Sequence, residues 1–137
     1  MNQKLRLVET INELRRLDQC NDYLQLAERL RQLPAKVPLE HQAIVSFLRG
    51  KLAVLEGDFP KAIPDLALSA QLAPQKAGVQ SLLGAVMVRC EHWLDARQAL
   101  RSALDINPTL VVARQELATV QLALNDPAGA LRLLVSL

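Results

Sequence analysis

Three adjacent residues, Cys90, Glu91 and His92, form the densest group of chemically reactive side chains in the sequence. A thiolate, a carboxylate and an imidazole can together bind a metal ion or activate a nucleophile. Adjacent side chains at a turn point in different directions, however, and His41 is the only other histidine. The sequence also has no glycine-rich phosphate loop and no His-Glu-x-x-His, Cys-x-x-Cys or Gly-x-Ser-x-Gly motif. We therefore predict no catalytic residue, no metal site and no cofactor, and that the chain is not an enzyme.

The composition favours a helical domain with mixed surface charge. Half of the 137 residues are apolar but only 3% are aromatic, so we expect a core of Leu, Ala, Val and Ile. Sixteen basic and fourteen acidic residues are spread along the chain, and nucleic acid or an anionic membrane is therefore not the expected partner. No apolar stretch approaches the ~18 residues of a membrane helix, and the first residues lack the pattern of a signal peptide. We expect a cytoplasmic protein.

The sequence repeats with a period of 34 residues. The repeated positions hold small residues (Gly50, Gly84, Ala118), alanines (Ala62, Ala96, Ala130), aliphatic residues (Val54, Val88, Leu122), leucines (Leu66, Leu100, Leu134), prolines (Pro74, Pro108) and an aromatic pair (Phe59, Trp93). Because several sets share one period, they indicate an array of similar structural units.

Each unit has the pattern of two helices joined by a turn. Apolar residues recur at helical spacing over residues 81–88, where Gly84 allows another helix to approach closely. A second apolar stripe includes Ala96 and Leu100, and Pro108 ends the unit because proline disfavours helical geometry in the residue before it. The array is therefore predicted to consist of helical hairpins.

These motifs resemble the tetratricopeptide repeat family. Leu83-Gly84, Ala96 with Leu100 four residues later, and the closing Pro108 follow the family pattern, and the resemblance covers about residues 43–137. It implies an all-α fold, a right-handed α-solenoid of about three and a half antiparallel helix hairpins. Within a single domain spanning 1–137, we expect repeats at 43–76 and 77–110 and a partial repeat at 111–137.

Residues 1–42 follow the pattern less closely. One apolar stripe runs from Leu5 to Leu17, and a second begins near Leu26 after a turn at residues 18–22. If Ala27 corresponds to Ala62, the offset is 35 residues rather than 34, whereas Pro38 and Pro74 are 36 residues apart, so the segment has one or two extra residues. We interpret this segment as a degenerate first hairpin that acts as an N-terminal cap.

The resemblance also implies a concave groove lined by the first helix of each hairpin. One subclass of the family binds a peptide's terminal carboxylate with a set of Lys, Asn and Arg residues. Of that set, only Lys51 is matched in this chain, because Phe47 stands in place of the usual Lys and Ala85 in place of the usual Asn. Phe47 has a second interpretation, in which it packs against Leu26 or Leu30 of the N-terminal hairpin. The groove residues expected from the resemblance are Ile44, Phe47, Lys51, Leu55, Ser81, Ala85, Arg89, Val112, Gln115 and Thr119.

The last helix is expected to leave an apolar edge uncovered. From Pro127 onward its one charged residue is Arg132. The edge consists of Leu131, Leu134, Val135 and Leu137. An uncovered apolar face is either an interface or a liability. We expect the chain to be the N-terminal part of a longer protein; the alternative is a complete chain, and self-association as a homo-oligomer through this edge is open in both cases.

Two functions remain open from the sequence. The favoured one is a non-catalytic protein–protein interaction module that binds a peptide or protein partner through the concave groove or the C-terminal edge. The alternative is the N-terminal regulatory or targeting region of a larger enzyme, such as a bacterial glycosyltransferase or sulfotransferase.

Overall fold

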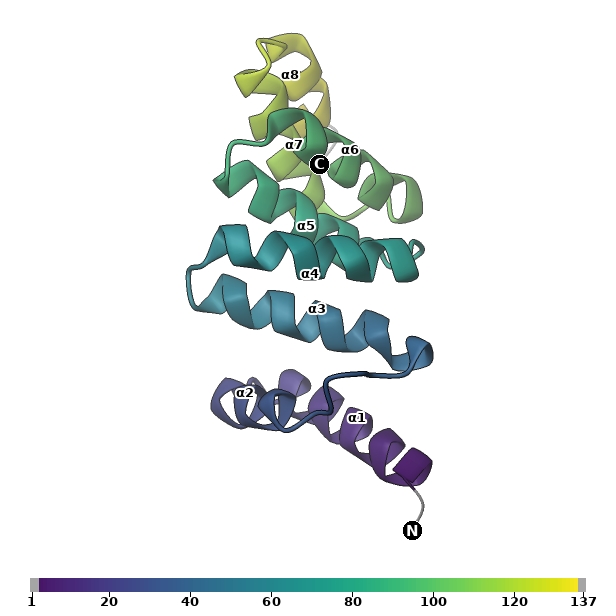
Figure 1. Ribbon diagram of the computed structural model, residues 1–137. Helices are drawn as coiled ribbons and strands as arrows, with labels where there is room; N and C mark the ends of the chain where they lie inside the picture. The colour runs from purple at the N-terminus through teal and green to yellow at the C-terminus, as the bar shows by residue number, and fades with distance from the viewer. Residues whose placement is uncertain (1–2, 136–137) are drawn as a thin grey trace.

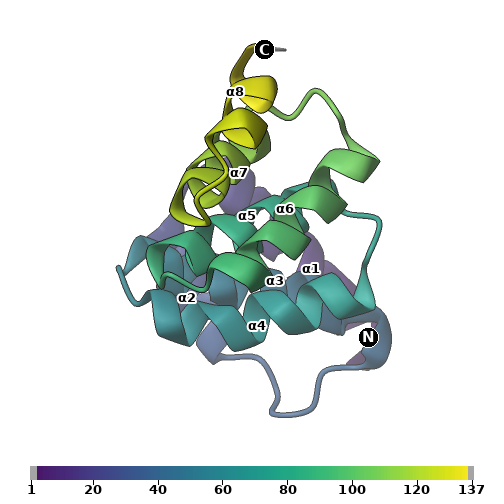
Figure 2. The same ribbon diagram turned by 90° about the horizontal axis from the view of Figure 1, so that it is seen from above.

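The computed structural model describes residues 3–135, which form α-helices and no strand. Neighbouring helices pair as antiparallel hairpins that stack from α1 and α2 at one end to α7 and α8 at the other (Figure 1). Figure 2 shows that α8 runs across the direction of α4, so the stack turns along its length. The prediction of an all-α solenoid of helical hairpins is confirmed. The helices are α1 (Gln3–Gln19), α2 (Tyr23–Arg31), α3 (Leu39–Leu55), α4 (Phe59–Leu72), α5 (Ala77–Arg89), α6 (Trp93–Ile106), α7 (Val111–Ala123) and α8 (Pro127–Val135).

One backbone conformation recurs at the turn inside each hairpin. The residue before the second helix's N-cap has a positive φ, a conformation that glycine and asparagine adopt most readily. At three of the four turns the N-cap is an aspartate whose side chain accepts a hydrogen bond from a backbone N–H of the first turn, whereas His92 makes no such bond. The positive-φ residues are Asn21 (56°), Gly57 (80°), Glu91 (60°) and Asn125 (62°), and the aspartate caps are Asp22, Asp58 and Asp126.

Glycines allow the two helices of each central hairpin to cross closely. A Cβ atom on Gly50 would lie 2.6 Å from Cγ of Leu66, and one on Gly84 would lie 2.5 Å from Cγ of Leu100. Both leucines are completely buried. The repeated pairing of a small residue with a leucine sixteen positions later is therefore a packing requirement.

The turns also set the register of the N-terminal hairpin. Asn21 corresponds to Gly57, which gives an offset of 36 residues. Of the two offsets open in the sequence, the turns fit the 36 residues between Pro38 and Pro74. The pairing of Ala27 with Ala62 is wrong, because Leu26 rather than Ala27 lies at the position of Ala62. Leu26 is fully buried, as Ala62 is, whereas Ala27 is half-buried.

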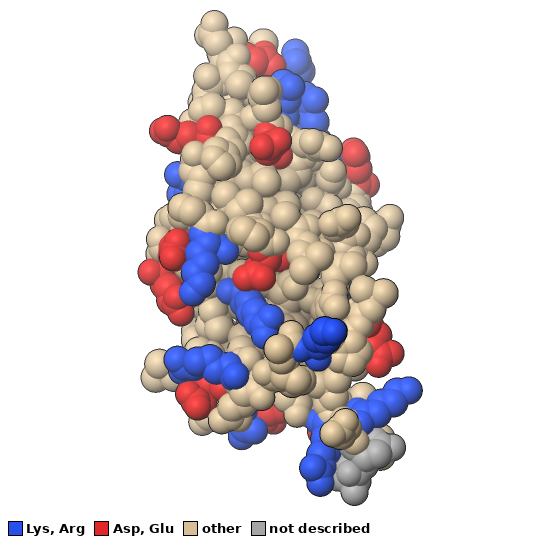
Figure 3. All heavy atoms as spheres, in the orientation of Figure 1, with Lys and Arg blue, Asp and Glu red and all other residues tan. Residues whose placement is uncertain are grey.

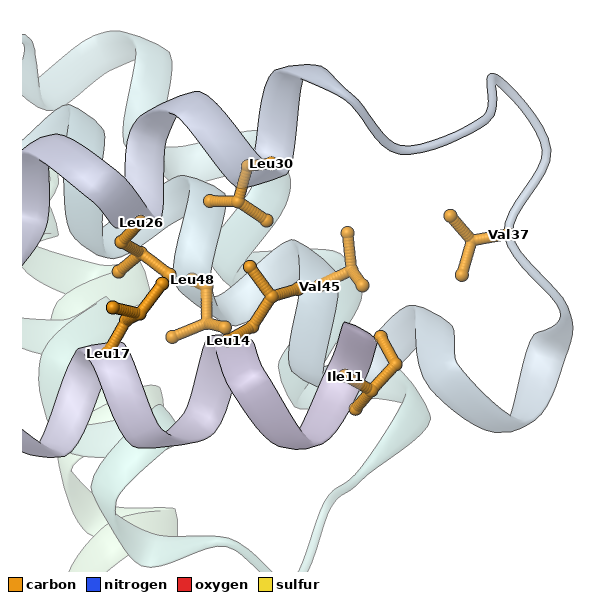
Figure 4. Close-up of a cluster of buried hydrophobic side chains, with 8 residues drawn as sticks. All are labelled: Ile11, Leu14, Leu17, Leu26, Leu30, Val37, Val45 and Leu48. Carbon is orange, nitrogen blue, oxygen red and sulfur yellow. The ribbon is translucent and has the colours of Figure 1, made fainter. Parts of the chain in front are cut away.

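This hairpin is built on large side chains at the helix crossing. At the offset of 36 residues, Leu14 occupies the position of Gly50, and both Leu14 and Leu26 are completely buried. Figure 4 shows them in one cluster with Leu17 and Leu48, between α1, α2 and α3. Helices α1 and α2 accordingly lie in close contact at fewer positions than α3 and α4 do.

The core continues along the stack as three overlapping clusters of buried side chains. The first joins α1, α2 and α3, the second runs from α3 to α6, and the third joins α5, α6 and α7. Phe47 contacts the first and second clusters, and Met87 contacts the second and third. Each hairpin is therefore stabilised by its neighbours, as expected for a solenoid.

Candidate functional site

A groove of 880 Å³ opens beside α3 and α5, the first helices of the two central hairpins. It lies where the second helix of a hairpin passes to the first helix of the next, so the connection between α4 and α5 forms part of its wall. Arg15 of α1 and Glu40 of α3 place charged groups along it. Its larger apolar side chains are Ile44, Phe47, Val79, Leu82 and Ile106.

Phe47 combines the two roles that the sequence left open. Its half-buried side chain packs against the cluster that contains Leu26 and Leu30. The same side chain contacts the central cluster and lines the groove. It is therefore both a structural contact and part of the groove lining.

Lys51 lines the groove but is already paired. Its Nζ atom lies 2.7 Å from Oδ1 of Asp18 and 5.9 Å from the centre of the Tyr23 ring. The Lys51 and Asp18 side chains are only 30% and 20% exposed, which protects the pair from full screening by solvent. A ligand carboxylate at Lys51 would have to compete with Asp18, and this ion pair instead ties α3 to α1.

Arg89 is paired in a similar way. Its Nη2 atom lies 3.4 Å from Oε1 of Glu116, and the pair joins α5 to α7. The Arg89 side chain is 53% exposed, so the interaction is weaker than a buried one. Both cations that were expected to face a ligand thus connect the first helices of neighbouring hairpins.

Besides Arg89, six of the residues expected to line the groove lie outside the 880 Å³ groove. Ser81 is 7% exposed and Ala85 is half-buried, so neither offers much surface. The other four are exposed on α3 or α7: Leu55, Val112, Gln115 and Thr119. The groove is limited to the region around α3 and the start of α5, because loops and second-helix ends form its walls there.

Several lining residues were not expected from the sequence. Lys76 and Gly78 come from the α4–α5 connection and the start of α5, and Ile106 comes from the end of α6. A Cβ atom on Gly78 would meet nothing within 4 Å, which marks it as an open position on the groove wall. Leu82 and Ile106 carried one usable signal, because each is an aliphatic residue that follows a leucine by 34 positions, Leu48 and Leu72 respectively.

The C-terminal edge presents exposed aliphatic side chains. Leu134 is 43% exposed, although Leu66 and Leu100, its counterparts in the repeat, are fully buried. Leu131 and Val135 are 61% and 73% exposed. The fourth predicted edge residue, Leu137, lies outside the described residues.

The reactive side chains are not grouped into a centre in the described part of the chain. His92 is exposed and Cys90 is half-buried, and both Cys90 and Cys20 are free thiols. Within residues 3–135 no group of three or more His, Cys, Asp or Glu side chains could hold a metal ion. No helix in that range is both long and apolar enough to span a membrane.

Known structures share this arrangement of helices. The TPR2B domain of yeast Sti1, solved in a complex with pHsp70, is 27% identical over 68% of this chain and 74% of its own, with a TM-score of 0.64. MamA from Desulfovibrio magneticus RS-1 is 20% identical over 93% of this chain and 71% of its own, with a TM-score of 0.76. The second TPR domain of Spaghetti (RPAP3), bound to the HSP90 peptide SRMEEVD, is 17% identical over 68% of this chain and 86% of its own, with a TM-score of 0.65. No family model and no curated protein matches the sequence.

The chain has the tetratricopeptide repeat fold. The resemblance seen in the sequence is confirmed by the paired helices and by their likeness to these solved repeat domains.

Proposed function

We propose that this chain is a protein-interaction module that binds an extended, largely apolar segment of another protein in the groove beside α3 and α5. The observation that carries the proposal is the 880 Å³ groove, which apolar side chains such as Ile44, Phe47 and Leu82 line. Two structures with the same fold were solved in complexes, one with pHsp70 and one with an HSP90 peptide. They support a role in binding peptides.

The chemistry of the groove favours apolar side chains over a terminal carboxylate. Ile44, Phe47 and Leu82 supply most of the apolar wall. Lys51 is held by Asp18 and the cations at the rim are balanced in part by Glu40. Binding energy would therefore come mainly from buried apolar area, at roughly 25 cal/mol per Å².

Gly78 provides a direct test of the groove. Gly78→Trp would fill the hollow without disturbing the core, because the position is open. Gly78→Ala is the matched control, since it replaces the same glycine but adds only a methyl group. Peptides selected from a phage-displayed library on the unmodified chain should bind Gly78→Trp at least about tenfold more weakly and Gly78→Ala unchanged. Equal binding to Gly78→Trp, or no selected peptide, would contradict the proposal.

The C-terminal edge is a second proposed surface, suited to the edge of another copy of the chain. Leu134 is exposed, whereas Leu66 and Leu100 are buried in clusters that include residues of the following helix, so an apolar helix face could cover Leu134 in the same way. Sedimentation equilibrium should show a concentration-dependent dimer that Leu134→Glu abolishes. A monomer at all concentrations would exclude this use of the edge.

A further inference from the structure

A second hollow lies at the N-terminal end of the stack, away from the groove. It has a volume of 710 Å³ and is formed by the first half of α1, the end of α2, the α2–α3 loop and the start of α3. The loop makes the hollow, because α2 has 9 residues where α4 and α6 have 14. The chain then crosses residues 32–38 before α3 begins, and Figure 4 shows Val37 pointing from this loop toward the helices.

Four cationic side chains and one carboxylate line this hollow. The cations are Lys4, Arg6, Arg29 and Lys36, and the carboxylate is Glu40. In Figure 3 basic side chains gather at the lower right, over the start of α1, whereas acidic and basic side chains are interspersed over the rest of that face.

The cations in the hollow lack the close ion pairs that other cations on the same helices make. Arg16 of α1 and Arg31 of α2 are paired with acidic residues of their own helix, at 2.6 Å and 3.0 Å. Among the described residues, none of the four cations of the hollow has a carboxylate within 4.0 Å. Arg29 does help to lower the pKa of Glu13, after the larger contribution of Arg16, so it lies within electrostatic range of one acidic group. The hollow nevertheless has an excess of positive charge, because four cations share its lining with the single carboxylate of Glu40.

Apolar side chains share the wall of the hollow with these cations and with three uncharged polar residues, Gln3, Thr10 and Gln32. Leu7 and Leu33 are half-buried and pack against the N-terminal core cluster, and Pro34 and Pro38 complete the apolar part of the lining. A recessed apolar surface ringed by cations can hold an apolar side chain while pairing with carboxylates on either side of it. A flat anionic surface such as a membrane would reach the ring of cations but not the floor.

We propose that this hollow is a second binding site, which takes an acidic peptide segment of a partner protein with an apolar side chain among its carboxylates. The site is independent of the groove beside α3 and α5, because the residues of the two hollows overlap only at Glu40. A partner could therefore contact both surfaces, or two partners could each contact one.

The test measures binding of a fluorescein-labelled peptide, Glu-Asp-Glu-Leu-Asp-Leu-Glu-Asp-Glu, by anisotropy. The double variant Lys4→Gln/Arg29→Gln should weaken binding about tenfold, and raising the ionic strength should weaken binding to the unmodified chain. The matched control, Arg16→Gln/Arg31→Gln, removes the same charge from the same two helices and should change binding less than about twofold. A peptide with both leucines replaced by serine should bind at least about fivefold more weakly, because the apolar floor is then unused.

Three results would overturn the proposal. Equal losses in the two double variants would show only long-range attraction by net charge. Loss of the acidic peptide from Gly78→Trp, with Lys4→Gln/Arg29→Gln unaffected, would place it in the groove instead. Binding to vesicles of phosphatidylcholine with about a third phosphatidylserine, lost in Lys4→Gln/Arg29→Gln while the peptide does not bind, would assign the cations to a membrane. Circular dichroism of each variant confirms that these surface changes leave the helices intact.

Discussion

The N-terminal hairpin and the central hairpins solve one packing problem in opposite ways. In the central hairpins Gly50 and Gly84 let the helices approach until a leucine of the second helix fills the space where a Cβ would be. In the N-terminal hairpin Leu14 occupies the same position, and the helices are held apart by large buried side chains. The repeated turn is kept in both, so the turn fixes the hairpin and the crossing residues set its spacing.

This difference has a functional consequence. A wider first hairpin with a short α2 needs a longer connection to α3. That connection forms part of the hollow lined by Lys4, Arg6, Arg29 and Lys36, which we call the basic hollow. The tighter central hairpins are joined by short connections, whose walls form the apolar groove. The two candidate binding surfaces thus arise from the two styles of packing.

The largest expected effect comes from Leu14→Ala. Leu14 is completely buried, so the change should leave a cavity and lower the free energy of unfolding by about 2–5 kcal/mol, measured by urea unfolding. Leu24→Ala in the same hairpin is the control, since Leu24 is 87% exposed and its loss should cost less than about 0.5 kcal/mol. A cost below about 1 kcal/mol for Leu14→Ala would mean that this hairpin is not packed as described.

Gly84→Ala tests the opposite requirement in a central hairpin. The added methyl group would collide with Leu100, which is fully buried and has no room to move, so we expect a loss of about 1–3 kcal/mol. Gly78→Ala, at an open helical position, should instead gain up to about 1 kcal/mol. If thermal melts rank the two variants the other way, close helix crossing does not explain the repeated glycine.

The turns offer a smaller, reciprocal test. Glu91 adopts φ 60°, where a side chain is strained, so Glu91→Gly should stabilise the chain by about 1 kcal/mol. Gly57→Glu should cost a similar amount, because Gly57 has φ 80° and nothing lies within 4 Å of the added Cβ to compensate. Urea unfolding of both variants checks the pair, and effects of the same sign would show that the turns are not equivalent.

Asp65 gives the smallest effect, near the junction of the two regions. Burial raises the pKa of Asp65, against smaller opposing contributions from Arg49 and Lys61. Since the folded state disfavours the ionised carboxyl, Asp65→Asn should be more stable than the unmodified chain at neutral pH. The advantage should shrink as the pH falls through the raised pKa and vanish below the ordinary value of 3.8. Melting temperatures across this pH range measure it, and an advantage that grows in acid would contradict the assignment.

Much of the fold could be predicted because its signals are local and repeated. The small residues, the leucines and the closing prolines recur at one period, and the Gly57-Asp58 and Asn125-Asp126 turns carry recognisable chemistry. The left-handed conformation of Glu91 could not be read from its residue type. The register of the first hairpin stayed open between offsets of 35 and 36 residues, because matching Ala27 to Ala62 gave 35, whereas Leu26 fills the position of Ala62 in the structure.

The binding surfaces were harder to predict because they depend on distant residues. Lys51 is engaged by Asp18, which lies 33 positions earlier in the sequence. The walls of the groove include loop and helix-end residues such as Gly78 and Ile106, which come from separate segments that the fold brings together. The basic hollow depends on the length of one loop and on which cations remain unpaired, and neither follows from the evenly mixed charges of the sequence.

The central claim is that the chain binds a peptide segment in the groove beside α3 and α5. Its most direct test is an NMR titration of the isotope-labelled chain with a peptide selected on it. The amide signals of Ile44, Gly78 and Leu82 should shift together and saturate at one dissociation constant. Shifts confined to Leu131 and Val135 at the C-terminal edge, with the groove signals unchanged, would contradict the account.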